Sequence, residues 1–300
     1  MNRNEFIKTT LGVAGLAAMG LPSLACAFDK KKQIPVGAHV WIYASKQPGY
    51  DVSPILPQIF SDMKYAGLDC VETMEHPLRK EETTKTIKEL IDQHDLPLIG
   101  TSYGADFWDR SKHGEIQEDV ENIMENMASV NARTFGVSVG RPKERIKTEE
   151  ELDAQAELLK KLIAFGKNKG IVLNLHNHTY EVENNLFDLK GTLKRIPEVK
   201  LGPDLNWLLR AQVDPIPFLN QYKDNIVFIH LRDQSDNGKW PESIGEGDVD
   251  FTEIGETLKN IDFSGDLIIE LAHEGGFVPT RPIKESLKMS REYVRNTMGY

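Results

Sequence analysis

Short apolar runs alternate with amphipathic stretches from residue 34 to the end of the chain. Each run is followed by a polar loop and then by a segment with apolar residues at helical spacing, which is the order of a strand–helix unit. The runs start roughly 27 to 40 residues apart and cover residues 36–42, 68–73, 96–101, 134–139, 171–176, 199–204, 226–231 and 267–271. They predict eight strands.

The segments between the runs predict helices. The clearest covers residues 152–165, where Leu158 and Leu162 share an apolar face and Gly166 follows the last turn. Others are predicted before Gly67 and around Val120, and over residues 186–196, 215–222, 251–261 and 283–294.

Eight strands that alternate with helices predict an α/β fold, a (β/α)8 TIM barrel in which residues 28–300 form one domain. A doubly wound open sheet is the alternative, but no glycine-rich phosphate loop follows the first run. In a TIM barrel the chemistry lies at the carboxyl ends of the strands. The side chains that follow the apolar runs are therefore the candidate site residues.

Residues 1–27 have the pattern of a signal peptide. Arg3 and Lys8 precede an apolar stretch at 11–21, which is too short for a membrane span, and the small residues at 25–27 suit a cleavage site. The stretch also resembles a twin-arginine signal that lacks one arginine. We therefore expect export to the periplasm by the Tat or the Sec pathway. A lipid anchor on Cys26 is disfavoured by the residues before it, and an apolar N-terminal tail is the alternative.

Charge and cysteine content narrow the classes of function. The net charge of −10 argues against a nucleic-acid partner, because a phosphate backbone requires a basic footprint. Without the signal peptide, Cys70 is the one remaining cysteine, so no intramolecular disulfide can form. It lies in an apolar run and is expected to be a buried small residue rather than a nucleophile.

Imidazole and indole side chains gather at the predicted carboxyl ends. Six of the eight histidines follow an apolar run closely: His39, His76, His176, His178, His230 and His273. All four tryptophans lie in or near the loops of the same face: Trp41, Trp108, Trp207 and Trp240. Random placement would put some of them in the helices. One face of the barrel is therefore expected to be a pocket rich in these side chains.

Four consecutive strand ends offer ligands for a divalent metal. They are His176 (with Asn174 in the same alternation), Asp204, His230 and Glu270. One such residue is usually a helix cap or a core histidine, but four in succession are harder to explain in that way. Two carboxylates and two imidazoles suit Mn²⁺, Co²⁺, Fe²⁺ or Zn²⁺ better than Ca²⁺ or Mg²⁺.

Two motifs carry a resemblance to a known family. They are Val-Phe-Ile-His-Leu-Arg-Asp at 227–233 and Gly-Glu-Gly-Asp-Val-Asp-Phe at 245–251, and the stretches 176–178 and 269–270 add to them. The chain resembles the xylose isomerase-like TIM barrels, which include sugar isomerases, ketose epimerases, inosose dehydratases and endonuclease IV. The resemblance implies a metal, Mn²⁺ first, held by His176, Asp204, His230 and Glu270.

The fifth strand departs from the ketose epimerases of that family. Those enzymes usually carry a glutamate there, which serves as ligand and as one of two proton-transfer groups. This chain has Asn174 and His176 instead, which leaves open which of the two would be the ligand. The His-x-His pattern is more similar to the inosose dehydratases and to uncharacterised sugar isomerase-like proteins.

The chemistry expected of such a site is proton abstraction next to a carbonyl through an enediolate. Glu270 or His178 would be the base, and the other would return the proton. Arg232 would neutralise developing charge, unless it simply pairs with Asp233. Candidates for substrate binding, each of which could instead serve packing or strand ends, are His39, Trp41, Glu72, His76, Trp108, Asn206, Trp207, Trp240 and Glu246.

Three functions remain open from the sequence. The first is a sugar isomerase or epimerase with a small carbohydrate substrate. The second is a lyase or hydratase acting on keto-inositols or 3-keto-glycosides, which export favours because phosphorylated sugars are cytoplasmic metabolites. The third is a metal-free, non-catalytic sugar-binding barrel. Endonuclease activity is disfavoured by the absence of a basic groove, and the oligomeric state is left open.

Overall fold

Eight parallel strands form a nearly closed barrel in the computed structural model, which describes residues 34–300. Hydrogen bonding runs in the order β6-β5-β4-β3-β2-β1-β8-β7, and two parallel bridges, Leu201–Ile226 and Asp204–His230, join β6 to β7. The strands are β1 (Val36–His39), β2 (Val71–Met74), β3 (Leu98–Gly104), β4 (Thr134–Ser138), β5 (Val172–Leu175), β6 (Lys200–Leu201), β7 (Phe228–Leu231) and β8 (Asp266–Ile269). The predicted TIM barrel is confirmed, whereas the predicted signal peptide lies outside the described residues.

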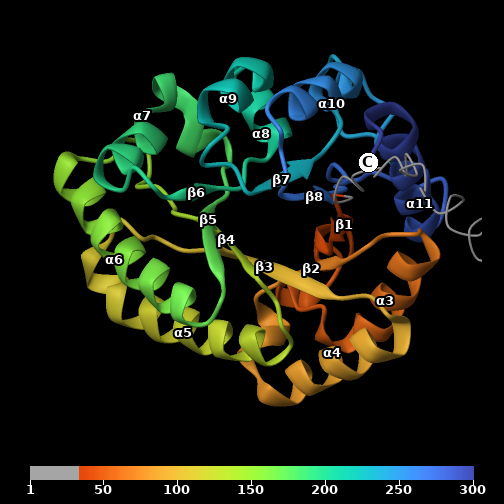
Figure 1. Cartoon of the computed structure of the whole chain (residues 1–300), viewed down its shortest axis with the longest axis horizontal. Helices are drawn as coiled ribbons and strands as arrows, with labels where there is room; N and C mark the ends of the chain where they lie inside the picture. Colours follow the sequence, from red (N-terminus) through yellow and green to blue (C-terminus); the bar gives the residue numbers. More distant parts are fainter. Residues whose placement is uncertain (1–33) are drawn as a thin grey trace, which may run out of the picture. The chain divides into compact units, whose positions relative to one another are not determined.

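The helices lie outside the barrel of strands, and each strand is followed in the chain by at least one of them (Figure 1). Because the helices cover the outer face of the barrel, the strands are buried on both faces and carry apolar residues on both. In β4, for example, every residue is buried. The helices are α2 (Trp41–Ala44), α3 (Leu56–Tyr65), α4 (Glu81–His94), α5 (His113–Ser129), α6 (Glu149–Asn168), α7 (Thr179–Arg195), α8 (Leu205–Arg210), α9 (Pro215–Tyr222), α10 (Phe251–Asn260) and α11 (Ile283–Tyr293).

Three local features differ from the expected elements. The first strand ends at His39 rather than at residue 42, because α2 begins at Trp41. The sixth strand ends at Leu201 rather than at residue 204, and the short helix α8 begins at Leu205. Helix α7 starts at Thr179, well before residue 186, and is interrupted by left-handed backbone over 184–186. In all three places helical backbone begins within four residues of a strand end.

The core fills the barrel and the layer between strands and helices. Cys70 is buried as predicted, and burial raises the pKa of its thiol. Within residues 34–300, no helix is both long and apolar enough to cross a membrane. Two groups of the buried polar residues lie at the carboxyl ends of the strands and between α6 and α7.

Candidate metal centre and active site

His176, Asp204 and His230 bring their ligand atoms within 4.8 Å of one another at the carboxyl ends of β5, β6 and β7. These are three of the four residues predicted as metal ligands. Asp204 and His230 also form the backbone bridge that closes the barrel, so the fold itself fixes their separation. The fourth, Glu270, follows β8 and places its carboxylate Oε2 2.9 Å from His230 Nδ1.

His176, and not Asn174, is the residue at the end of β5 that joins the cluster. Asn174 is two residues earlier, and its amide donates to Thr134 Oγ1 at 2.7 Å. Thr134 is the first residue of β4, so Asn174 lies deeper in the barrel than the rim. Burial lowers the pKa of His176 well below its usual value, which keeps the imidazole neutral, the form that binds metals.

The Asp204 carboxylate accepts three hydrogen bonds in addition to its place in the cluster. As N-cap of α8 it accepts the backbone N–H of Asn206 at 2.8 Å and of Trp207 at 3.2 Å through Oδ1. Its Oδ2 accepts from Arg232 at 3.0 Å. The Asp204 carboxylate therefore both caps the N-terminus of α8 and belongs to the cluster.

His230 lies between two glutamates in the buried centre of the site. Its Nε2 is 2.6 Å from Glu72 Oε2, and its Nδ1 faces Glu270. Burial acts to lower the pKa of His230, but the two carboxylates outweigh it and raise the pKa to about 10. Glu72 was a candidate either for binding a substrate hydroxyl or for an ordinary strand-end carboxylate, and in the structure its carboxylate contacts His230.

Arg232 pairs with Asp204 and with Glu270 Oε1, all three of them buried. The alternative pairing with Asp233 is wrong. Asp233 instead accepts backbone N–H groups of the loop before α10, from Gly245 at 2.8 Å and Gly247 at 2.9 Å. Burial alone would raise the pKa of Glu270, but Arg232 and His230 hold it well below its usual value.

The donor set fits a divalent cation. Three buried carboxylates, those of Glu72, Asp204 and Glu270, face two cationic groups, the Arg232 guanidinium and the His230 imidazole, so one negative charge is in excess. The ring atom His176 Nδ1 is buried and has no hydrogen-bond partner among residues 34–300. Unpartnered nitrogen and excess negative charge are what a bound cation would satisfy.

A second histidine of β5's loop, His178, stands at the edge of the cluster. Its ring centroid is 5.2 Å from that of His176 and 5.4 Å from that of Trp207. Its Nδ1 is 3.1 Å from the Ser138 hydroxyl. Burial lowers the pKa of His178 to about 4, so the imidazole is neutral at pH 7.

Two of the predicted tryptophans form a wall beside the cluster. Trp207 and Trp240 meet edge to face with centroids 5.8 Å apart, and the Arg232 guanidinium lies 5.1 Å from the Trp240 ring. Asn206 accepts from the Trp240 indole N–H at 2.9 Å and so fixes that ring. His39 also joins the site, with Nδ1 3.8 Å from Glu270.

Four predicted substrate-binding residues are engaged elsewhere. Trp41 packs against Tyr50, and His76 pairs with Glu75. The indole N–H of Trp108 bonds to Asp106, and Glu246 pairs with Arg281. In the described part of the chain, no hydrogen bond, ion pair or ring contact joins Trp41, His76, Trp108 or Glu246 to His176, Asp204, His230 or Glu270.

The model of one protein family matches residues 60–293, and its description is a xylose isomerase-like TIM barrel. The chain belongs to this family. An inosose dehydratase of Clostridium perfringens is 25% identical over 166 residues, which are 49% of this chain and 55% of the relative. The chain therefore spans about half the length of the curated relatives that it matches.

Solved structures of similar fold include sugar epimerases. D-psicose 3-epimerase, solved in the presence of D-fructose, has a TM-score of 0.72 at 13% identity over 89% of this chain and 100% of that chain. 3-Keto-D-glucoside 4-epimerase from E. coli has a TM-score of 0.69 at 16% identity over 88% of this chain and 100% of that chain. A sugar phosphate isomerase/epimerase from Parabacteroides distasonis has a TM-score of 0.69 at 17% identity over 88% of this chain and 94% of that chain. At these identities the likeness shows the fold alone.

Sequence reasoning missed one group of residues in this xylose isomerase-like barrel. Ser138, Tyr180 and Glu181 surround the inner edge of His178. The signal was present as a capping-box spacing, because His178 is the N-cap of α7 and Glu181 is three residues later. Since α7 was predicted to begin at residue 186, that spacing was not interpreted.

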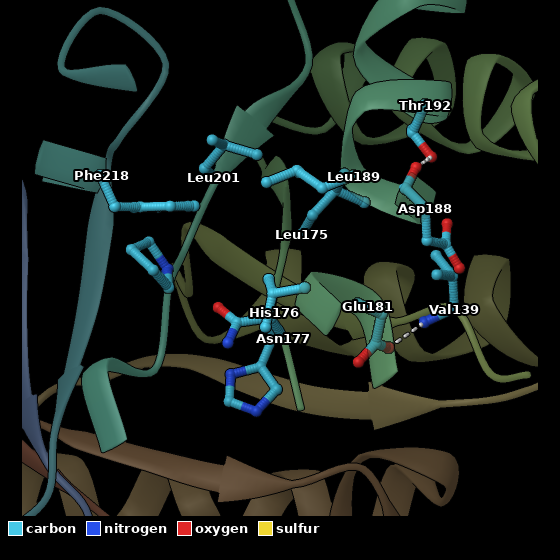
Figure 2. A pocket seen from close by; sticks show the side chains of 12 residues that line it. Val139, Leu175, His176, Asn177, Glu181, Asp188, Leu189, Thr192, Leu201 and Phe218 are labelled. Carbon is cyan, nitrogen blue, oxygen red and sulfur yellow. Dashed lines mark hydrogen bonds between the residues drawn. The ribbon is translucent and has the colours of Figure 1, made fainter. Parts of the chain in front are cut away.

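A small internal cavity of about 20 Å³ lies behind the cluster, between β5, β6 and α7 (Figure 2). That volume has room for about one water molecule. Glu181 and Asp188 line it, whereas the His176 ring extends away from Leu189 and Thr192. Burial raises the pKa of Glu181 to about 7.

Proposed function

We propose that the protein is a metal-dependent enzyme that isomerises or epimerises a carbohydrate by removing a proton next to a carbonyl. The observation that carries this proposal is the cluster of His176, Asp204 and His230, with Glu270 beside it, at the carboxyl face of the barrel. Similarity in fold to sugar epimerases and membership of the xylose isomerase-like family support it.

The chain's own residues divide into holding and reacting groups. His176, Asp204, His230 and Glu270 would hold the cation, of which Mn²⁺ is our first choice and Co²⁺, Zn²⁺ and Fe²⁺ are alternatives. When bound, it would supply a Lewis acid that polarises the carbonyl and stabilises the negative charge formed next to it.

His178 is the better placed of the two candidate bases. Both oxygens of Glu270 are engaged, one by Arg232 and one by His230, which suits a fixed anionic ligand. His178 is neutral, partly exposed and adjacent to the tryptophan wall, so its free ring nitrogen can reach a bound sugar. Arg232, held by Asp204 and Glu270, contributes fixed positive charge near the reacting carbons.

A lyase or hydratase acting on keto-inositols or 3-keto-glycosides is the second candidate. A shallow, open depression of about 600 Å³ adjoins Trp207 and would admit the aglycone of a glycoside; it is lined by Thr179, Trp207, Arg210, Asn237, Gly238, Lys239 and Glu274. Strand β5 carries His176 where ketose epimerases usually carry a glutamate. Export, which we propose from residues 1–27, also favours substrates without phosphate.

Metal analysis and deuterium exchange test these functions. We expect the purified protein to contain a divalent metal, and His176→Ala to lose it, while His94→Ala on α4 keeps it. Keto-sugars incubated in D₂O and followed by NMR should gain deuterium on carbon for an isomerase or epimerase. Loss of water or of an aglycone identifies the lyase instead. A protein that binds no metal and turns over no sugar would contradict both and favour the sugar-binding barrel.

A further inference from the structure

Ser138 is the centre of a buried hydrogen-bond cluster on the inner edge of His178. Its Oγ lies 2.5 Å from Glu181 Oε1, 2.7 Å from the Tyr180 hydroxyl and 3.1 Å from His178 Nδ1. Ser138 and Glu181 are buried. Three polar neighbours around one hydroxyl use all of its hydrogen-bonding capacity, which is one donor and two acceptor positions.

Counting donors fixes the direction of each bond. Glu181 accepts the backbone N–H of Val139 at Oε1, 3.1 Å away, and that of His178 at Oε2, 2.7 Å away (Figure 2 shows the first). When Glu181 is ionised, above its pKa of about 7, both carboxylate oxygens are acceptors, and the single proton of Ser138 goes to Glu181. The lone pairs of Ser138 must then accept from its two other neighbours, Tyr180 O–H and His178 Nδ1–H.

We infer that Ser138 and Glu181 are positioning residues that hold His178 as the Nδ1–H tautomer, with the lone pair of Nε2 left free to take a proton. The base role of that lone pair rests on the proposed function; the tautomer itself does not. In the reaction, the C–H bond next to the carbonyl breaks, its proton passes to Nε2, and its electron pair moves towards the carbonyl oxygen. The imidazolium that forms keeps its Nδ1–H on Ser138, with the Glu181 carboxylate behind it.

The contacts exceed what a helix cap requires. A capping box needs the His178 backbone N–H on one glutamate oxygen, yet the other oxygen of Glu181 bonds to Ser138 and Val139. Tyr180 could direct its proton to His178 Nδ1 instead, but that distance is 3.4 Å against 2.7 Å to Ser138. The Tyr180 ring also stacks on the His178 ring at 12° and fixes its plane.

The first test compares two single-atom deletions in this cluster. Ser138→Ala removes the acceptor of the Nδ1–H, so kcat should fall about 10- to 100-fold, the usual effect of losing a group that orients a functional side chain, with little change in KM. Tyr180→Phe keeps the stacked ring and the Ser138–His178 bond, so kcat should stay within about twofold. Ser138→Thr restores the hydroxyl and should recover most of the loss. Equal losses in Ser138→Ala and Tyr180→Phe would overturn the inference.

The second test observes the tautomer directly. Long-range ¹H–¹⁵N correlation spectra of the protein loaded with diamagnetic Zn²⁺ should show His178 protonated on Nδ1 in the wild type and in Tyr180→Phe. Ser138→Ala should shift it towards Nε2–H. A wild-type His178 protonated on Nε2 contradicts the inference even if sugars are turned over. The expected tautomer without turnover of any sugar contradicts the proposed function and leaves the positioning role standing.

Discussion

The barrel contains two buried ionic networks that are built differently. One, the closed network, comprises Lys147, Gln155, Asp188 and Thr192, between α6, α7 and the loop before α6. The other, the open network, comprises Glu72, Asp204, His230, Arg232 and Glu270 at the carboxyl ends of the strands. Both are almost wholly removed from solvent.

The closed network balances its charges and satisfies its polar atoms. Lys147 donates to Asp188 and, at 2.7 Å, to Gln155, whose amide donates in turn to Asp188 and Thr192. One cation faces one anion. In the open network three carboxylates face two cationic groups, Arg232 and His230, which leaves one negative charge in excess. In the described region neither Arg232 Nε nor His176 Nδ1 has a hydrogen-bond partner. Burial of charge alone therefore does not indicate function; an unbalanced, unsatisfied network does.

The largest expected effect comes from breaking the closed network. Lys147→Met leaves Asp188 buried and unpaired, and should lower the free energy of unfolding by roughly 3 to 5 kcal/mol, measured by urea denaturation. Metal content and kcat of the folded protein should be unchanged. Lys161→Met, which breaks an exposed pair with Glu157, should cost less than about 0.5 kcal/mol. If the two substitutions cost the same, the closed network is not a stabilising unit.

We expect the stability of the protein to depend on pH through Glu181, which lines the small cavity behind β5. Because burial raises its pKa to about 7 in the folded protein, protonated Glu181 favours folding. This contribution is complete below about pH 4.5, the usual pKa, and is lost as the pH rises through 7. It amounts to roughly 3 kcal/mol. Unfolding free energies measured between pH 4.5 and 8 should fall less steeply in Glu181→Gln than in the wild type. The exposed substitution Glu198→Gln should leave the wild-type slope, and parallel curves for Glu181→Gln would refute the assignment.

The local patterns of the sequence predicted the strands and most of the residues at their carboxyl ends, but not which of these side chains contact one another. Apolar runs followed by His176, Asp204, His230 and Glu270 placed these residues correctly at one face. Arg232 and Asp233 follow β7 and have different partners: Arg232 pairs with Asp204 and Glu270, whereas Asp233 accepts backbone N–H groups of the loop before α10.

Contacts between side chains on opposite sides of the barrel could not be predicted from the sequence. Glu72 and His230 lie 158 residues apart on strands that are not neighbours in the sheet. Their contact depends on the closure of the barrel, which no local pattern encodes. The Glu181 contacts were missed for a different reason, because they depend on where α7 starts.

Metal addition should separate the two networks by stability. At a free Mn²⁺ concentration 100 times the dissociation constant, the wild type should gain about 2.7 kcal/mol, seen as a rise in Tm. Asp204→Asn keeps the side chain's size and its N-cap acceptor but should lose this gain. Lys147→Met, though less stable, should keep it. A gain that persists in Asp204→Asn would place the cation elsewhere.

The smallest effect concerns the carboxylate behind His230. With Nε2 bonded to Glu72, His230 presents Nδ1 to the cluster, and a carboxylate partner raises the basicity of a metal-binding imidazole. Glu72→Gln keeps the shape but removes the charge, so the affinity for Mn²⁺ should fall about 10- to 100-fold, measured by calorimetric titration. Because the amide can still accept the hydrogen bond, the loss should be smaller than in Asp204→Asn. Glu82→Gln on the exposed first turn of α4 serves as the control. If Glu72→Gln leaves the affinity for Mn²⁺ unchanged, Glu72 is a structural buried charge like those of the closed network and does not support metal binding.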